Sequence, residues 1–187
     1  MYEKSESEEL ASRAAGGDAE AFRALLRLHY DRVFRVVYSV VRNQSDAEDI
    51  TQDIWAAMPG KLRHWRGEAK LTSWLHRIAV NAAKDALRKS ATRARTTAGY
   101  VEVDALARGE AADTERRLTW LQSALDTLSV DLRATAALTL GEQMKFAEAA
   151  EALGVAEGTI AWRMSEIRRR LKTLAAKDNG LDQEALA

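Results

Sequence analysis

Apolar residues recur every three or four positions through most of the chain, a spacing that predicts helices. The first long run follows Gly16-Gly17, with Asp18 placed to cap it, and contains Phe22, Leu25, Leu26, His29, Val33, Val36, Val37, Val40 and Val41. In the second run, Ser45 and Glu48 have the spacing of a capping box. This helix is predicted to end near Met58, because Pro59-Gly60 come next.

A third run, "LTSWLHRIAVNAAKDALRK", has one apolar stripe, made of Leu71, Leu75, Ile78, Ala82 and Ala86. Residues 91–113 lose the periodicity and are rich in small side chains, so they are predicted to link two domains. Beyond them, Leu118, Leu121, Leu125 and Leu128 indicate a helix, and more helices are predicted over 131–140, 146–153 and 156–176. The predicted fold is therefore all-α, with two small helical domains joined by a flexible linker.

Composition narrows the class of protein. Of the 187 residues, 47% are hydrophobic and 30% are charged, as in a globular protein, and no apolar run is long enough to span a membrane. The N-terminal "MYEKSESEEL" has no apolar stretch, so we expect no signal peptide and a cytoplasmic protein without membrane insertion. Cysteine is absent and the three histidines are scattered, which predicts no cofactor, no metal site and no enzyme.

Charge is strongly segregated, although the formal net charge is zero. Residues 1–60 hold 7 basic and 11 acidic residues, residues 61–95 hold 10 basic and 2 acidic, and residues 162–177 hold 6 basic and 1 acidic. Two basic segments on a neutral chain are typical of two contacts with a polyanion. Taken alone, each segment could equally be a solvated helix face.

The second basic segment lies in "FAEAAEALGVAEGTIAWRMSEIRRRL", a sequence typical of a helix-turn-helix. Gly154 stands where the first helix needs a positive φ to end, and Ile160, Met164, Ile167 and Leu171 are predicted to face inward. The outer face then consists of Thr159, Trp162, Arg163, Glu166, Arg169 and Arg170. Its first residues are predicted to contact bases and its last ones phosphates. The alternative is a buried helical hairpin with a basic edge.

Two surfaces of the N-terminal half differ in charge. The outer face of the helix predicted over "DAEDITQDIW" consists of Asp46, Asp49, Gln52 and Asp53. This acidic face suits contact with a basic protein surface, or it serves only solubility. The following loop and helix interleave cations with aromatic rings, an arrangement that suits binding of an unpaired nucleic-acid strand. The residues of this surface are Lys61, Arg63, His64, Trp65, Arg66, Lys70, Trp74, Arg77, Asn81, Lys84 and Arg88. Trp65 and Trp74 could instead belong to the core.

Three motifs in this order and spacing resemble the bacterial extracytoplasmic-function (ECF) sigma factors: "DAEDITQDIW", "SWLHRIAVNAAKDALRK" and "LGVAEGTIAWRMSEIRRRL". The resemblance covers about residues 18–90 and 114–175. It implies an alternative sigma factor that binds core RNA polymerase, recognises the −35 and −10 promoter elements, helps to melt the −10 region and directs transcription initiation. Members of this family are usually controlled by an anti-sigma factor.

The resemblance also implies a division of the chain. The expected parts are an acidic N-terminal extension (1–17), sigma region two (18–90), a linker (91–113), sigma region four (114–177) and a tail (178–187). The acidic face would dock on the β′ clamp helices, and the basic set from Lys61 to Arg88 would bind the −10 element and capture a flipped base. The helix-turn-helix would contact the −35 element and the β flap. The linker, with Glu102 and Asp104, would pass through the RNA exit path.

This chain departs from the family pattern at the −35 contacts. Ala156 replaces the usual capping residue before the recognition helix, and Ala161 and Trp162 replace a cation and a small polar residue. Glu166 falls where a base-contacting cation can sit, and Glu148 begins a variant of the family's "EIA" pattern. Glu148 and Ala161 therefore join the predicted −35 set, and the preferred −35 sequence cannot be transferred from relatives.

Two other classes of protein fit parts of the sequence. A dimeric helix-turn-helix regulator would bind duplex DNA alone and would not need the acidic face at residues 46–53. A decoy that imitates a sigma factor and sequesters an anti-sigma factor should lose the basic −10 surface, whereas residues 61–95 keep a net charge of +8.

Overall fold

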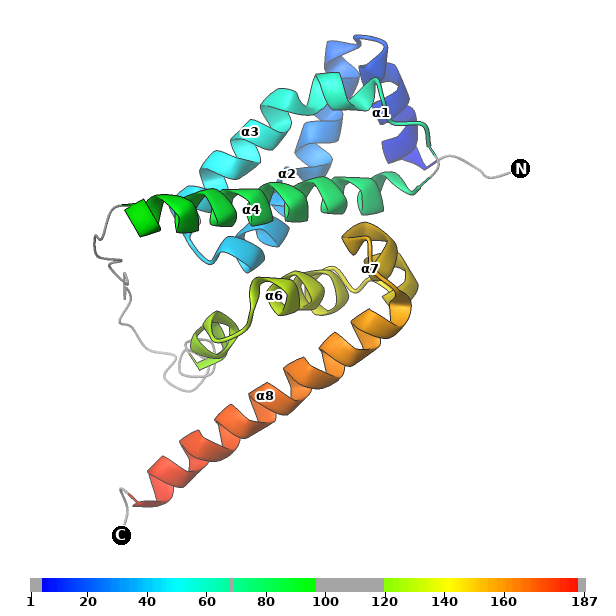
Figure 1. Cartoon of the computed structure of the whole chain (residues 1–187). Helices are drawn as coiled ribbons and strands as arrows, with labels where there is room; N and C mark the ends of the chain where they lie inside the picture. The colour runs from blue at the N-terminus through cyan, green and yellow to red at the C-terminus, as the bar shows by residue number, and fades with distance from the viewer. Residues whose placement is uncertain (1–4, 68, 97–119, 185–187) are drawn as a thin grey trace, which may run out of the picture.

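The computed structural model describes residues 5–67, 69–96 and 120–184, and the side chains of these residues up to 92 and from 120 to 176. Helices account for all its regular structure: α1 (Glu6–Ala15), α2 (Ala19–Val41), α3 (Gln44–Leu62), α4 (Leu71–Thr96), α6 (Val130–Ala136), the π-helical segment η1 (Ala137–Gly141), α7 (Phe146–Leu153) and α8 (Glu157–Glu184) (Figure 1). Residues 120–126 are helical as well. No described helix is both long and apolar enough to cross a membrane. Glu102 and Asp104 lie outside the described residues.

Helix α2 is the centre of the α1–α4 unit. Its N-terminus is capped as predicted, because Asp18 Oδ1 accepts hydrogen bonds of 3.0 Å from the backbone amides of Glu20 and Ala21. The predicted apolar face is buried except at Phe22 and Leu26, which are half-buried, and the helix packs against α1, α3 and α4. At the C-terminal end, Arg42 adopts a left-handed conformation with φ 62° and turns the chain towards α3.

Helix α3 differs from its prediction at both ends. It begins at Gln44, and the cap is Asn43, whose side chain accepts from Asp46 N at 2.9 Å, so the predicted capping box at Ser45 is wrong. It also continues through Pro59 to Leu62. Proline removes only one intrahelical hydrogen bond here, and complete burial of Met58 and Leu62 stabilises the last turn.

Helix α4 is covered from two sides, so its predicted single stripe is split. Ala79, Val80 and Ala83 lie outside the predicted stripe but are at most 1% exposed, and the helix contacts α2 and α7. Ile78 and Ala82, which belong to the predicted stripe, are half-buried beside α3. The helix runs to Thr96, which is within the range predicted as linker, and α8 likewise continues past residue 176 to Glu184.

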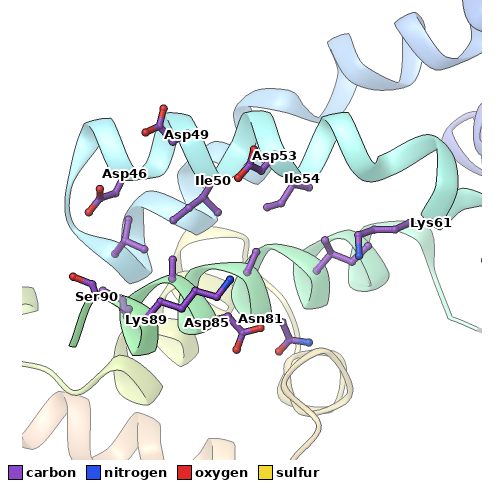
Figure 2. Close-up of a pocket in the computed structure, with 15 residues that line it drawn as sticks. Asp46, Asp49, Ile50, Asp53, Ile54, Lys61, Asn81, Asp85, Lys89 and Ser90 are labelled. Carbon is purple, nitrogen blue, oxygen red and sulfur yellow. The ribbon is translucent and has the colours of Figure 1, made fainter. Parts of the chain in front are cut away.

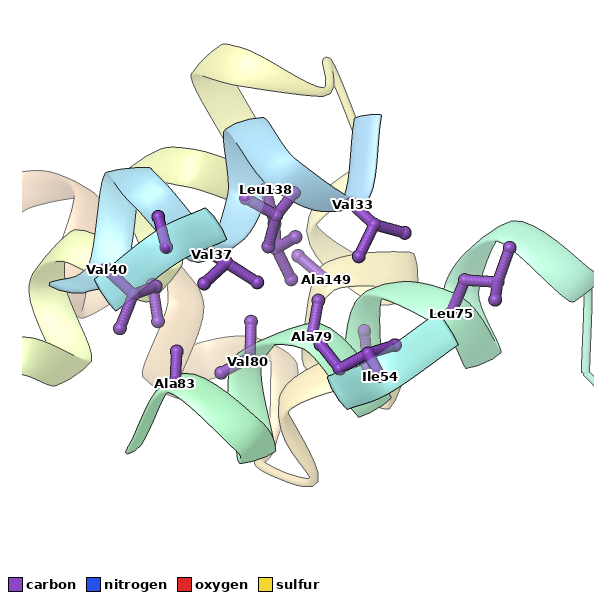
Figure 3. Packing of buried hydrophobic residues seen from close by; sticks show 14 of the residues in the cluster. Val33, Val37, Val40, Ile54, Leu75, Ala79, Val80, Ala83, Leu138 and Ala149 are labelled. Atoms are coloured by element: carbon purple, nitrogen blue, oxygen red, sulfur yellow. The ribbon is translucent and has the colours of Figure 1, made fainter. Parts of the chain in front are cut away.

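The α6–α8 unit packs directly on the α1–α4 unit. Leu138 of η1 and Ala149 of α7 lie in the same buried cluster as Val33 and Val37 of α2 and Ala79 of α4 (Figure 3). Contacts join α4 to α7 and α2 to both α6 and η1. The sequence pattern predicted two domains on a tether and did not predict this shared core.

Candidate functional site

The helix-turn-helix depends on the conformation of Gly154. This residue ends α7 with φ 65° and ψ 38°, as predicted, and its N–H donates to Glu151 O at 3.3 Å. The next amide, of Val155, donates to Ala150 O at 3.0 Å, which closes the end of α7. Ala156 has no side chain to cap α8, and the first turn is closed by the backbone bond from Thr159 N to Ala156 O at 2.9 Å.

The inner and outer faces of α8 follow the prediction at most positions. Ile160, Met164 and Ile167 are at most 3% exposed and pack into the core. Trp162 is 64% exposed, one of the most exposed large apolar side chains of the described residues, and Ala161 beside it is exposed as well. Thr159 is half-buried. A broad aromatic ring therefore stands on the surface in the first two turns of the helix.

Arg163 does not lie on the outer face, so that prediction is wrong. Its side chain is only 12% exposed, and Nη2 lies 3.2 Å from Asp131 Oδ2 of α6. Its Nη1 lies 3.5 Å from Thr135 Oγ1 of the same helix. The guanidinium is drawn inward because α6 offers a carboxylate and a hydroxyl beside α8. Arg163 therefore supports the helix pair from inside.

Glu166 restrains two arginines of the outer face. It accepts hydrogen bonds from Arg169, at 2.7 and 2.8 Å, and from Arg170, at 2.7 Å. The hydrogen bonds from Arg169, followed by those from Arg170, lower the pKa of Glu166 to about 2. Arg168, which sequence reasoning missed, is exposed and forms no ion pair within the described part of the chain.

A groove of about 640 Å³ separates α3 from α4 (Figure 2). Asp46, Asp49 and Asp53 follow one another along α3, are exposed, and make no ion pair with any described residue. The rest of the lining combines apolar side chains with polar ones, namely Val41, Ile50, Ile54, Lys61, Ile78, Asn81, Ala82, Asp85, Ala86, Leu87, Lys89 and Ser90. Gln52 is exposed on α3 but does not line the groove. The groove thus combines an acidic rim with an apolar floor.

The residues predicted for the −10 element fall into three places. Lys61 and Asn81 line the groove with the acidic row. Arg63, His64 and Arg66 are exposed in the loop after α3, where His64 Nδ1 lies 3.0 Å from Gly60 O. Trp65 and Trp74 are half-buried and pack against the core, so each indole is shared between core and surface.

The remaining −10 cations mostly face the α6–α8 unit. Lys70 Nζ lies 2.7 Å from Glu148 Oε1, and Lys84 Nζ lies 2.5 Å from Asp131 Oδ1. Arg77 donates to the backbone carbonyl of Glu151. Arg88, by contrast, pairs with Asp85 of its own helix at 3.1 Å.

These contacts lower the pKa values of two acidic partners, Asp131 and Glu148. The hydrogen bond from Lys84 is the main cause of a lowered pKa for Asp131, and that from Lys70 is the main cause for Glu148. Glu148, which is predicted to contact the −35 element, thus pairs in this structure with Lys70 of the loop before α4.

A buried acidic residue, missed by sequence reasoning, lies between the two units. The Glu142 side chain is 5% exposed, and its carboxylate lies 2.8 Å from Arg32 Nε and 3.5 Å from Arg35 Nη2, both on α2. His76 Nε2 of α4 lies 3.7 Å away. A lone glutamate in a turn is usually solvated, and no local pattern marks its distant partners.

His76 is neutral in this cluster. Burial, followed by the charge of Arg32 and the nearby His29, lowers its pKa to about 4. Glu142 would favour the charged imidazole, but its carboxylate already pairs with two guanidinium groups. His76 Nδ1 lies 3.2 Å from Met144 Sδ, which follows η1.

Comparison with known proteins identifies the class that these surfaces define. Residues 25–93 match the family described as Sigma-70 region 2. Over 173 residues the chain is 36% identical to the ECF RNA polymerase sigma factor SigM of Mycobacterium tuberculosis, covering 92% of this chain and 86% of SigM. The chain belongs to the ECF RNA polymerase sigma factors, as its three motifs predicted, and it is thus a transcription-initiation factor.

Solved structures share the fold over most of the chain. RpoE from Bartonella quintana, crystallised with the anti-sigma factor NepR, has a TM-score of 0.73 and 25% identity, covering 84% of this chain and 98% of RpoE. CnrH in complex with the cytosolic domain of CnrY has a TM-score of 0.71 and 24% identity, covering 93% and 99% of the two chains. The all-helical architecture of both units is therefore that of known sigma factors.

Proposed function

We propose that this sigma factor uses three separate surfaces: the α3–α4 groove for core RNA polymerase, the loop after α3 with α4 for the −10 element, and α8 for the −35 element. The observation that carries the proposal is the acidic row Asp46, Asp49 and Asp53, which has no partner within the described residues although it borders an apolar groove. Such a row repels DNA and attracts a basic protein surface.

The groove suits a helical partner with apolar and basic side chains. Ile50, Ile78 and Ala82 would bury apolar residues, while the aspartates would pair with lysine or arginine. The β′ clamp helices of core polymerase are the proposed occupant. Gln52, exposed on the same helix, would contribute a polar contact at the edge.

The −10 surface suits an unpaired strand. Arg63 and Arg66 are exposed beside Trp65, and the exposed part of Trp74 stands at the start of α4. Cations would hold the phosphates while the exposed parts of the indole rings stack on unpaired or flipped bases. Lys70, Arg77 and Lys84 would join this surface once their present carboxylate and carbonyl partners release them.

The −35 surface is the exposed side of α8. Trp162 would contact thymine methyl groups, deoxyribose or the polymerase β flap, since it has no core to fill. Arg168 would contact phosphates and add affinity without sequence preference, and Arg169 and Arg170 would do the same when Glu166 releases them. Arg163, held by Asp131, would orient the helix without contacting bases.

The proposal includes control by an anti-sigma factor, because RpoE and this chain share their fold and RpoE was crystallised with one. It places the protein in the cytoplasm, where core polymerase works, and assigns no catalytic residue. The net charge of zero supports separate roles for these surfaces. The affinity for the promoter complex would come mainly from binding to polymerase, and the basic surfaces would select the promoter sequence.

Run-off transcription tests the proposal. Core polymerase with this protein should initiate on a defined subset of genomic fragments, in a salt-sensitive manner, while the isolated protein should bind duplex DNA weakly. Tight, sequence-specific binding by the isolated protein would favour a dimeric regulator. Capture of an anti-sigma factor without any transcription would favour a decoy.

A further inference from the structure

We propose that this sigma factor recognises its −35 element through the methyl groups of thymine, and that Trp162 is the residue that determines this preference. The inference rests on the proposed function and deepens it, because it names the base chemistry that α8 contacts. Of the contacts open to the indole, it selects the edges of the bases.

One stripe of exposed residues runs along α8 on the side away from the core. Its members are three or four residues apart, which places them on one face of the helix. They are Gly158, Ala161, Trp162, Ser165, Arg168, Arg169 and Lys172. The buried Ile160, Met164 and Ile167 lie on the other face. The stripe is uncharged as far as Ser165 and basic from Arg168 onwards, so its two halves suit different parts of a DNA duplex.

The basic half of the stripe indicates that its partner is a polyanion. Arg168 and Lys172 are exposed, and neither forms an ion pair within the described part of the chain. Cations at these positions suit DNA phosphates, and phosphate contacts fix how a recognition helix lies on the duplex. The N-terminal turns of such a helix then lie against the base edges. Trp162 stands in those turns, on the same face as the cations.

The uncharged half of the stripe carries no polar group that distinguishes one base pair from another. Ala161 ends in a methyl group, and the Ser165 hydroxyl both donates and accepts, so it suits any base. The indole N–H of Trp162 can donate to guanine, adenine or thymine alike. Sequence preference in these turns therefore has to come from apolar contact.

The arginine of the first two turns is withdrawn from this surface. Arg163 is only 12% exposed, with Nη2 at 3.2 Å from Asp131 Oδ2 and Nη1 at 3.5 Å from Thr135 Oγ1. Arginine and lysine are the residues that most often read guanine, through its O6 and N7 acceptors. Glu157, exposed in the first turn, only accepts hydrogen bonds when ionised and cannot replace them. The first two turns of α8 thus offer guanine no cation.

The indole of Trp162 suits the one apolar group that base pairs present in the major groove, the C5 methyl of thymine. Trp162 is 64% exposed, and its neighbours on the stripe, Ala161 and Ser165, are small. The ring can therefore project beyond them into the groove. Covering one methyl group removes apolar surface from water and should raise affinity about fourfold.

Deoxyuridine tests the proposal, because it keeps the base pair of thymine and removes only the methyl group. The holoenzyme, formed from core polymerase and this chain, first selects its promoter from random −35 sequences. Thymines of the selected element are then replaced singly, on either strand, and the affinity is measured by competition in the cold, before the −10 region melts. At one position or more the affinity should fall about fourfold. At such a position 5-methylcytosine should bind about fourfold better than cytosine.

Two variants identify the residue that contacts the methyl group. Holoenzyme with Trp162→Ala should bind the thymine and deoxyuridine fragments equally well. Arg168→Ala is the matched control, since it removes another exposed side chain of the same stripe. It should weaken binding to all fragments alike and keep the fourfold difference. Circular dichroism checks that each variant is folded, and the measurements on the unaltered chain decide even if one is not.

A −35 element in which no thymine methyl contributes to affinity overturns the proposal. So does a folded Trp162→Ala variant that keeps the ratio between thymine and deoxyuridine, because the indole would then contact deoxyribose or the polymerase flap. Failure of the holoenzyme to bind any promoter specifically would remove the proposed function as well. Failure of the thymine preference alone leaves specific promoter binding in place, so the two results are distinct.

Discussion

Asp131 of α6 and Arg163 of α8 form an ion pair, with Oδ2 and Nη2 3.2 Å apart, and the other oxygen of the same carboxylate lies 2.5 Å from Lys84 Nζ. One side chain of α6 thus links the recognition helix to a cation of the −10 surface. We therefore expect Arg163 to act in the packing of the α6–α8 unit, and the DNA contacts proposed for α8 to come from its neighbours.

Arg163→Ala should destabilise the chain by about 1 kcal/mol, because the buried arginine loses a charged hydrogen bond whose partner Asp131 is half-exposed and therefore screened. The preferred −35 sequence should stay unchanged in a selection from random promoters. Arg168→Ala is the control, since this exposed arginine has no ion pair among the described residues and its loss should weaken DNA binding without changing the melting temperature. A changed sequence preference in Arg163→Ala would mean that Arg163 contacts bases.

Trp162→Ala and Ile167→Ala should have opposite effects on stability and transcription. Trp162 is 64% exposed, so its loss should leave thermal stability nearly unchanged and reduce transcription from promoters that depend on a −35 element. Ile167 is 1% exposed, and its truncation should cost roughly 2–5 kcal/mol, the usual cost of emptying a core site. Thermal melting and run-off transcription measure both. Unfolding of the Trp162 variant would contradict the surface role.

Helices were predictable because their apolar spacing is a local property of the sequence. Their ends depend on single side chains, and here two competing signals misled the prediction: Asn43 caps α3 two residues before Ser45, and burial of Leu62 outweighs Pro59. The direction of Arg163 was not predictable from α8 alone. It lies at the edge between the two faces of the helix, and Asp131 of another helix decides which way it turns.

The acidic row on α3 was predictable, since exposed charges and buried apolar residues separate cleanly along one helix. The pairing of Glu142 with Arg32 and of Glu148 with Lys70 was not, because each joins residues far apart in the sequence. Such pairs depend on how the two helical units pack, which spacing along a single helix does not encode.

Asp53→Lys should weaken binding to core polymerase by at least about tenfold, since like charges across a docked interface cost several kcal/mol. The protein should remain folded, because Asp53 is exposed on the rim of the groove. Glu48→Lys is the matched control: it makes the same charge change on α3 outside the groove lining. Affinity measured by fluorescence polarisation should fall much further for Asp53→Lys, and equal losses would contradict docking in the groove.

Stability should fall as the pH drops from about 6.5 towards 4, because His76 is neutral in the folded chain with a pKa of about 4. The unfolded chain binds a proton near pH 6.5, so His76 stabilises fully above that pH and loses about 3 kcal/mol of its contribution on the way down. His29, whose pKa burial also lowers, adds a loss of the same sign.

Urea unfolding at pH 7, 6 and 5 measures this effect above the range in which the carboxylates titrate. The groups around His76 are His29 and Arg32 of α2 and Glu142 after η1. His76→Gln should lose less stability than the unaltered chain over the same interval. Parallel pH profiles would mean that His76 has the same pKa in the folded and unfolded chain, so that Glu142 offsets the effect of burial.

Glu166→Gln should strengthen non-specific DNA binding by releasing two arginines. In the unaltered chain Glu166 accepts hydrogen bonds from both Arg169 and Arg170, and with a pKa of about 2 it stays ionised in any buffer in which polymerase works. The variant should therefore make the slope of log affinity against log salt concentration steeper by about one unit for each arginine that gains a phosphate contact.

Glu157→Gln controls for the charge change in this experiment. Glu157 is exposed in the first turn of the same helix and has no arginine partner among the described residues, so its loss removes an equal charge without freeing a cation. Salt titrations of a mixed-sequence duplex with both variants should give a steeper slope for Glu166→Gln alone. Equal slopes would mean that Arg169 and Arg170 already contact phosphate while bound to Glu166, and that the carboxylate orients these arginines without restraining them.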